Sequence, residues 1–122
     1  MSLRGKVFMI VNIQDCEKRN PQTIANIAHA TGLKHIAVKI ADGPWRWNFL
    51  RSGQDLVPPL ISALHERGIK VWGWHYLYGN QPLIEANIAI RRILELSGLD
   101  GYIMEIESQF IRVDSFIRMQ PW

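Results

Sequence analysis

The sequence predicts an α/β fold with a parallel sheet, organised as four consecutive strand–helix units that form half of a (β/α)8 barrel. The first observation behind this prediction is a recurring motif in which a glycine follows a helical run and precedes an apolar residue and a strand. It occurs at Gly32-Leu33-Lys34, Gly68-Ile69-Lys70 and Gly98-Leu99-Asp100. Glycine suits a helix C-terminus, and intervals of 36 and 30 residues hold one strand, one helix and two loops.

The second observation is the alternation of strand-like and helical segments, which is typical of a parallel sheet. The third is that each strand has one apolar face and one face that turns polar toward its carboxyl end. In the segment 35–41, one face carries Ile36, Val38 and Ile40, and the other carries Ala37, Lys39 and Ala41. Such a gradient is typical of a barrel strand, whose outer face packs on helices and whose inner face opens into a site.

The first unit joins a strand over Lys6–Ile13 to a helix over Asn20–Ala30. Asn20 is a favourable N-cap, and Pro21 fits the first helical position because its missing N–H needs no partner there. The turn 14–19 between them contains no glycine, which argues against the phosphate-binding turn of a dinucleotide fold. Spacings of three and four residues place Ile24, Ile27 and Ala28 on the buried face of this helix.

The second unit joins a strand over His35–Ala41 to a helix over Leu56–Arg67, whose first turn tolerates Pro58-Pro59. The third joins a strand over Lys70–Tyr78 to a helix over Pro82–Leu96 that Asn80 caps. The residues expected to face inward from these two helices are Leu60, Ile61, Leu64, Ile84, Ile88 and Leu94.

The fourth strand is predicted over Tyr102–Glu107, and the barrel-like domain over residues 1–108. Residues 109–122 then form a C-terminal amphipathic tail, with apolar side chains spaced for one more helix over the sheet.

The polar side chains expected inside the sheet, at its carboxyl end, are Asn12, Lys39, His75, Glu105 and Glu107. The strand around His75 allows two phases. We place Gly73 and His75 inside because small residues suit a crowded interior, whereas the opposite phase lines the interior with aromatic rings. His75 then serves as an acid–base group or as a buried, hydrogen-bonded histidine.

Glu105 and Glu107 are candidate catalytic residues because they lie two apart on one strand and point the same way, with Cα atoms roughly 6–7 Å apart. Two carboxylates this close do not both ionise freely, so one pKa rises, as a general acid requires. Lys39 on a nearby strand would hold the other carboxylate ionised. The alternative is a pair of solvated glutamates that bind Lys39 without any catalytic role.

The loop 42–49 supplies candidate substrate-binding residues in Asp42, Trp45 and Trp47. Indole faces stack on sugar rings, and the same rings stack on bases if Arg46 and Arg51 meet phosphates. A third alternative is an apolar lid over the mouth of the sheet.

The amino-acid composition excludes several classes of partner. The net charge of +3, from 14 basic and 11 acidic side chains, is dispersed, so nucleic acid is not expected. No apolar run reaches the ~20 residues of a membrane span, and no signal peptide is seen, so the default location is cytoplasmic. Neither a metal nor a cofactor is expected, because ligand spacings are absent and Cys16 is the single cysteine.

Three stretches resemble the family 25 glycoside hydrolases, which are muramidases. Val38-Lys39-Ile40-Ala41-Asp42-Gly43 resembles the family's strand-two signature, Gly73-Trp74-His75-Tyr76 its strand-three segment, and Gly101-Tyr102-Ile103-Met104-Glu105-Ile106-Glu107 its strand-four segment. The order and spacing match over residues 5–108, the first half of such a barrel. The resemblance implies hydrolysis or binding of a β-linked glycan, with Glu107 as proton donor, Glu105 in place of an assisting Asp, and Asn12 where an Asp ends strand one.

The chain differs from this family in its length and in the acidic residues of the site. A complete barrel takes about 250 residues, and 122 supply half of it. Asn12 cannot ionise, and Glu105 reaches further than Asp. We therefore expect a homodimer that completes the barrel, since a half barrel exposes two parallel strand edges. The alternative is an inactive barrel fragment or a self-assembling scaffold.

Overall fold

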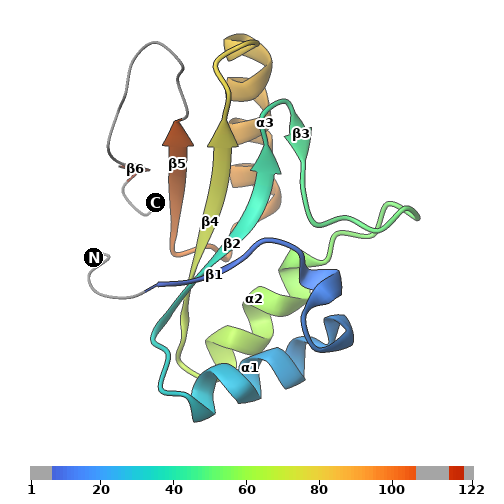
Figure 1. The fold of residues 1–122 in the computed structure, drawn as a ribbon, viewed down its shortest axis with the longest axis vertical. Helices are drawn as coiled ribbons and strands as arrows, with labels where there is room; N and C mark the ends of the chain where they lie inside the picture. The colour runs from blue at the N-terminus through green and yellow to red at the C-terminus, as the bar shows by residue number, and fades with distance from the viewer. Residues whose placement is uncertain (1–6, 107–115, 120–122) are drawn as a thin grey trace.

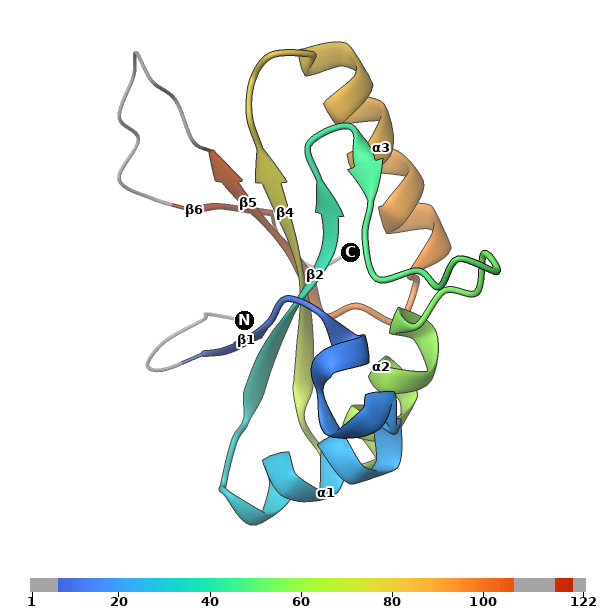
Figure 2. The same cartoon turned by 45° about the vertical axis from the view of Figure 1, so that its right-hand side comes forward.

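The protein has an α/β fold in which three helices cover one face of a mainly parallel sheet (Figures 1 and 2). The computed structural model describes residues 7–106 and 116–119. The helices are α1 (Pro21–Ala30), α2 (Val57–Glu66) and α3 (Pro82–Glu95), and two 3₁₀ turns span Ile13–Asp15 and Glu17–Arg19. The strands are β1 (Phe8–Ile10), β2 (His35–Asp42), β3 (Trp45–Arg46), β4 (Lys70–Leu77), β5 (Gly101–Ile106) and β6 (Phe116–Met119).

The parallel strands β1, β2, β4 and β5 lie side by side in the order in which the chain makes them. The predicted α/β class with a parallel sheet is thus confirmed. β3 adds to β2 and β6 adds to β5, both antiparallel. A helix over the tail is therefore wrong for Phe116–Met119, and the rest of residues 109–122 lies outside the described residues. The expected open edge at β5 is also wrong, because β6 pairs with it.

All three helices lie on the same side of the sheet, as Figures 1 and 2 show. Their apolar side chains share one core with the β2 residues Ile36, Val38 and Ile40, which is the face predicted to meet helices. A doubly wound sheet has helices on both faces. The opposite face, which we call the open face, carries a separate small cluster of Ala37, Trp72, Trp74 and Ile103.

The start of α1 and the ends of α1 and α2 form as the local signals predict. The Asn20 side chain accepts a hydrogen bond from the Thr23 N–H at 3.1 Å, and Pro21 occupies the first turn of α1. Gly32 and Gly68 follow α1 and α2 with φ of 77° and 71°, in the left-handed region that glycine enters without a Cβ clash.

The predicted phase of β4 is wrong. Gly73 and His75 face the helices, and Trp72, Trp74 and Tyr76 lie on the open face, as the register with β2 requires. A Cβ at Gly73 would lie 2.5 Å from Ile40 Cδ1 and 2.8 Å from Leu99 Cδ1. The small residue is therefore needed on the crowded helix side of the sheet.

The predicted phase of β1 is also wrong, because placing Asn12 inside the sheet places Phe8 and Ile10 there too. Ile10 is instead buried in the helix-side core, whereas Val7 packs on the small apolar cluster of the opposite face. The register explains the difference, because Phe8 and Ile10 pair with Ile36 and Val38, whose side chains face the helices.

Helix α3 begins at the predicted residue and ends one residue before the predicted end, but it buries a different face. The predicted Asn80 cap is wrong, because Gln81 holds the N-cap position and makes no side-chain capping hydrogen bond. Ile84 and Leu94 are exposed, whereas Glu85, Ala89 and Arg92 are buried. Tertiary hydrogen bonds decide the orientation. Glu85 accepts from the backbone N–H groups of Tyr78 and Gly79, both at 2.8 Å, while Arg92 donates to loop and strand carbonyls.

Candidate functional site

Polar and aromatic side chains gather on the open face at the carboxyl end of the parallel strands. Register places Asp42, Tyr76 and Glu105 in one row across β2, β4 and β5, and places Lys39 beside Trp74 in the row before it. The carboxyl end of parallel strands is where barrel proteins build their sites. We call the following residues the open-face cluster: Lys39, Asp42, Trp47, Trp74, Tyr76, Tyr78 and Glu105.

A β-bulge in β2 brings Lys39 and Asp42 to the same face. Lys39 pairs with Trp74 and Ala41 with the next residue, His75, so Ile40 has no partner of its own on β4. The extra residue changes the alternation, and Lys39 Nζ reaches Asp42 Oδ1 at 2.9 Å. Tyr78 Oη donates to the same oxygen at 2.9 Å. These two contacts fix the direction of the Asp42 carboxylate.

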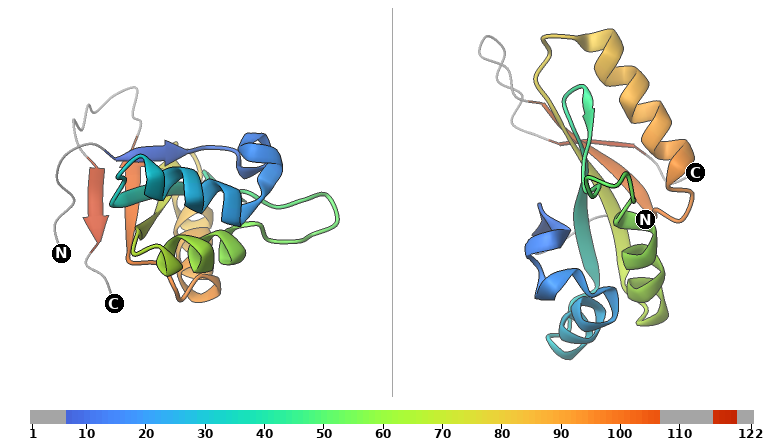
Figure 3. Two further views of the ribbon diagram at one scale, coloured as in Figure 1. Left: turned by 90° about the horizontal axis from the view of Figure 1, so that it is seen from below. Right: turned by 90° about the vertical axis from the view of Figure 1, so that its right-hand side faces the viewer.

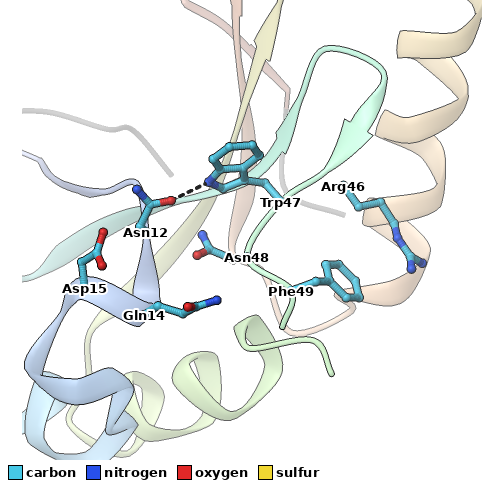
Figure 4. Close-up of a pocket in the computed structure, with 7 residues that line it drawn as sticks. All are labelled: Asn12, Gln14, Asp15, Arg46, Trp47, Asn48 and Phe49. Atoms are coloured by element: carbon cyan, nitrogen blue, oxygen red, sulfur yellow. Dashed lines mark hydrogen bonds between the residues drawn. The ribbon is translucent and has the colours of Figure 1, made fainter. Parts of the chain in front are cut away.

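Trp47 connects this cluster to the end of β1. Its indole Nε1 donates to the Val11 carbonyl at 3.0 Å and to Asn12 Oδ1 at 3.1 Å (Figure 4). Lys39 Nζ lies 4.4 Å from the centre of the Trp47 ring and 5.4 Å from that of Trp74, within cation–π range of both. Two predicted site residues, Lys39 and Trp47, are thus in contact, and Asn12 adjoins them.

A pocket of about 460 Å³ lies beside Trp47, lined by Asn12, Gln14, Asp15, Arg46, Trp47, Asn48 and Phe49 (Figure 4). Asn48 forms its floor. It has a φ of 68°, and its side chain accepts from the Ile13 N–H at 2.8 Å while donating to the carbonyls of Val11 and Lys39 at 3.0 and 2.6 Å. The pocket joins the end of β1 to the open-face cluster.

Glu105 is positioned by an aromatic neighbour. Trp74 Nε1 donates to Glu105 Oε2 at 2.9 Å, and the Trp74 and Tyr76 rings meet edge to face with centroids 6.4 Å apart. The Tyr76 and Tyr78 rings follow at 5.0 Å. The three aromatic rings therefore form a continuous row that runs from the exposed Tyr78 to the buried Trp74 and ends at the Glu105 carboxylate.

Trp45 and Glu107 complete the list of predicted residues. Trp45 pairs with Asp42 in the β2–β3 ladder and is 68% exposed, so its ring lies open at the edge of the cluster. Glu107 lies outside the described residues. The predicted Glu105–Glu107 pair therefore stays a prediction.

His75 is the predicted site residue that the structure places elsewhere. It is fully buried on the helix side, between the Tyr102 hydroxyl at 2.5 Å and the Gly43 carbonyl at 2.9 Å. Because a carbonyl only accepts, Nε2 carries the proton, and the Tyr102 hydroxyl donates to Nδ1. Burial lowers the pKa of His75 despite the Gly43 carbonyl, Glu85 and Asp42, which favour the charged form. The histidine is a neutral structural link.

The buried neutral His75 makes stability depend on pH. Since the pKa is lowered in the folded protein, the unfolded chain binds more protons as pH falls below about 6.5. We expect the urea midpoint to fall between pH 7 and pH 5. His75→Gln should flatten that part of the profile, because no imidazole remains to be protonated. A profile with the same slope in both proteins would contradict the assignment.

Arg92 supports the site from the helix side. Its guanidinium is fully buried and donates to the carbonyls of Ile40 and Trp47, at 2.7 and 3.2 Å, and to Asp55 Oδ2 at 2.7 Å. The Ile40 carbonyl also accepts from the Trp47 N–H at 3.0 Å. Although burial opposes it, Arg92 and Arg46 together lower the pKa of Glu95. This network fixes Trp47 to the bulge.

Trp74, Tyr76 and Tyr78 belong to the predicted site only in the alternative phase of their strand, and sequence reasoning misses Asn48 altogether. A signal for the first three exists in the alternation Trp72-x-Trp74-x-Tyr76-x-Tyr78, which places aromatic rings on one face of a strand. Nothing local identifies Asn48, whose partners lie nine or more residues away in sequence.

Within residues 7–106 and 116–119, no three His, Cys, Asp or Glu side chains are grouped to hold a metal ion. In the same part of the chain, no helix has the length and apolar character needed to cross a bilayer. Comparison with known proteins gives no match, either among protein-family models or among curated proteins.

Proposed function

We propose that the chain is half of a (β/α)8 barrel that binds and hydrolyses a β-linked glycan at its open-face cluster. The observation that carries the proposal is the row Asp42, Tyr76 and Glu105, in which an aromatic ring lies between two carboxylates on neighbouring strands. Sugar sites combine these elements, since aromatic faces stack on the C–H face of a ring and carboxylates accept its hydroxyl hydrogens.

The half-barrel part of the proposal is supported by the strand order. Four parallel strands follow one another in chain order with every helix on one side, which is the winding of a barrel rather than of a doubly wound sheet. The open face then corresponds to the barrel interior.

The dimensions of the cluster fit a sugar chain. Asp42 and Glu105 are two strand spacings apart, so their Cα atoms are separated by roughly 9–10 Å with Tyr76 between them. A sugar ring over Tyr76 can meet a carboxylate at each end. Trp45, which is exposed beside Asp42, would carry the next ring.

In the hydrolytic step we assign Glu107 as the acid that protonates the oxygen of the leaving sugar as the bond from that oxygen to the anomeric carbon breaks. A water molecule then adds to the anomeric carbon, and its proton returns to Glu107. Glu105, held by Trp74 Nε1, stabilises the positive charge that develops at the anomeric carbon. Lys39 and Tyr78 hold the Asp42 carboxylate in place, and its oxygens accept hydrogen bonds from sugar hydroxyl groups.

The test is a panel of soluble β-linked oligosaccharides and peptidoglycan fragments, with binding followed by tryptophan fluorescence and cleavage by release of reducing ends. Glu107→Gln should abolish cleavage, a loss of at least about 100-fold for a general acid, and leave binding unchanged. Trp45→Ala should weaken binding by about fivefold, since stacking on one exposed ring is worth about 1 kcal/mol.

Phe8→Ala is the matched control, because Phe8 is an exposed aromatic residue, 54% accessible, away from the open face. It should bind like the unchanged protein. If the unchanged protein binds glycans without cleaving them, the glycan site stands and the catalytic roles of Glu105 and Glu107 are wrong. Failure of every glycan in the panel to bind would overturn the proposal.

A further inference from the structure

Helix α3 carries an apolar surface that no described residue covers. Leu83, Ile90 and Leu94 are 80%, 57% and 76% exposed, and their spacing of seven and four residues aligns them along one side of the helix. The buried residues Glu85, Ala89 and Arg92 lie on the opposite side. We call Leu83, Ile90 and Leu94 the α3 stripe. A stripe this regular is typical of a helix that binds in a groove.

A matching groove lies between α1 and β1, which run alongside each other (Figure 3, left). It has a volume of about 490 Å³ and is lined mainly by apolar side chains, among them Phe8, Ile24, Ile27 and Leu33. Phe8 and Ile27 are about half exposed, so the groove is open to solvent. We call it the α1–β1 groove.

The stripe and the groove are both apolar, and the charged side chains beside them are of opposite sign. Asp15 and Glu17, both exposed, line the groove. Arg91 lies beside the stripe, one residue after Ile90. It pairs with Glu95 at 3.4 Å, and its side chain is 58% exposed, so this surface pair leaves it within reach of an acidic partner. One molecule cannot join its own two surfaces, because α1 and α3 lie at opposite ends of the helix layer (Figure 2).

We propose that the α3 stripe of one copy docks in the α1–β1 groove of a second copy. The contact is head-to-tail, because the two copies use different surfaces. Two copies that each place their stripe in the other's groove form a closed pair, and otherwise successive copies form an open chain. It buries apolar side chains that each copy leaves in water. The contact does not depend on glycan binding, and it differs from pairing at the β5 edge, which β6 occupies.

The experiment uses the full chain in sedimentation velocity over a concentration series, with circular dichroism to confirm folding. Ile90→Glu removes the stripe, and Ile27→Glu blocks the groove. Each variant alone should sediment as a monomer, with an apparent dissociation constant raised at least about tenfold. An equimolar mixture of the two should recover a species of two chains, because each variant retains the surface that the other lacks.

Ser62→Glu is the control, since it adds the same charge at an exposed position on α2 and should leave assembly unchanged. Leu94→Glu and Phe8→Glu replace the first two variants if either fails to fold. A monomeric unchanged protein would overturn the proposal. So would self-association of the groove variant alone, which indicates stripe-to-stripe pairing, and so would a mixture that stays monomeric.

Discussion

Replacing Arg92 with methionine is expected to lower the free energy of unfolding by about 3 kcal/mol. Methionine keeps the apolar stem but removes the donors to the Ile40 and Trp47 carbonyls and to Asp55. Removing one partner of a buried ion pair costs about 3–5 kcal/mol, because the remaining partners stay buried and unpaired. The lower end applies here, since the side chains of Asp55 and Glu95 are 20% and 27% exposed and recover water.

The neighbouring Arg91 provides the control. It pairs with Glu95 at 3.4 Å but is more than half exposed, so Arg91→Met should cost less than about 1 kcal/mol. Arg92→Lys should fall between the two, because one ammonium cannot reach the separated acceptors that the guanidinium spans. Urea unfolding followed by circular dichroism measures all three. Equal losses for the Arg91 and Arg92 methionine variants would show that the buried network carries no stability.

The structure explains why the strand–helix order could be predicted while some faces could not. Helix boundaries depend on neighbours in sequence: Asn20 and Pro21 start α1, and Gly32 ends it. The face of α3 depends on distant groups. The Ile40 carbonyl lies 52 residues from Arg92, and no periodicity in the helix indicates that it requires a buried arginine.

In the candidate site, too, some features follow from neighbouring residues in the sequence and others from distant groups. Alternation alone predicts that Lys39 and Glu105 lie on the face away from the helices, and the register agrees. The contact between Lys39 and Asp42 arises from a bulge that alternation does not predict. The predicted phase of β4 is wrong because it takes the barrel interior to be the crowded side of Gly73, whereas Ile40 and Leu99 crowd the helix side.

The site and the fold both depend on the Asn48 side chain. Replacing it with alanine should lower the free energy of unfolding by about 3–4 kcal/mol. Alanine removes three hydrogen bonds to the backbone of Ile13, Val11 and Lys39, each worth about 1 kcal/mol net. The alanine must also adopt the φ of 68° found at this position, which costs an ordinary L-residue about 1 kcal/mol or more. The carboxyl ends of β1 and β2 would lose their direct link through this side chain.

Asn48→Gly separates the two contributions, because glycine adopts a positive φ freely but makes none of the three bonds. We expect the glycine variant to be more stable than the alanine variant by about 1 kcal/mol, and less stable than the unchanged protein by about 2–3 kcal/mol. Asn48→Asp should resemble alanine or exceed it, since its second oxygen would face the carbonyls of Val11 and Lys39 that now accept hydrogen bonds. Urea midpoints rank the three variants. An alanine variant as stable as the glycine variant would mean that the left-handed backbone at position 48 costs alanine nothing, and the loss of the three side-chain hydrogen bonds would then account for the whole effect.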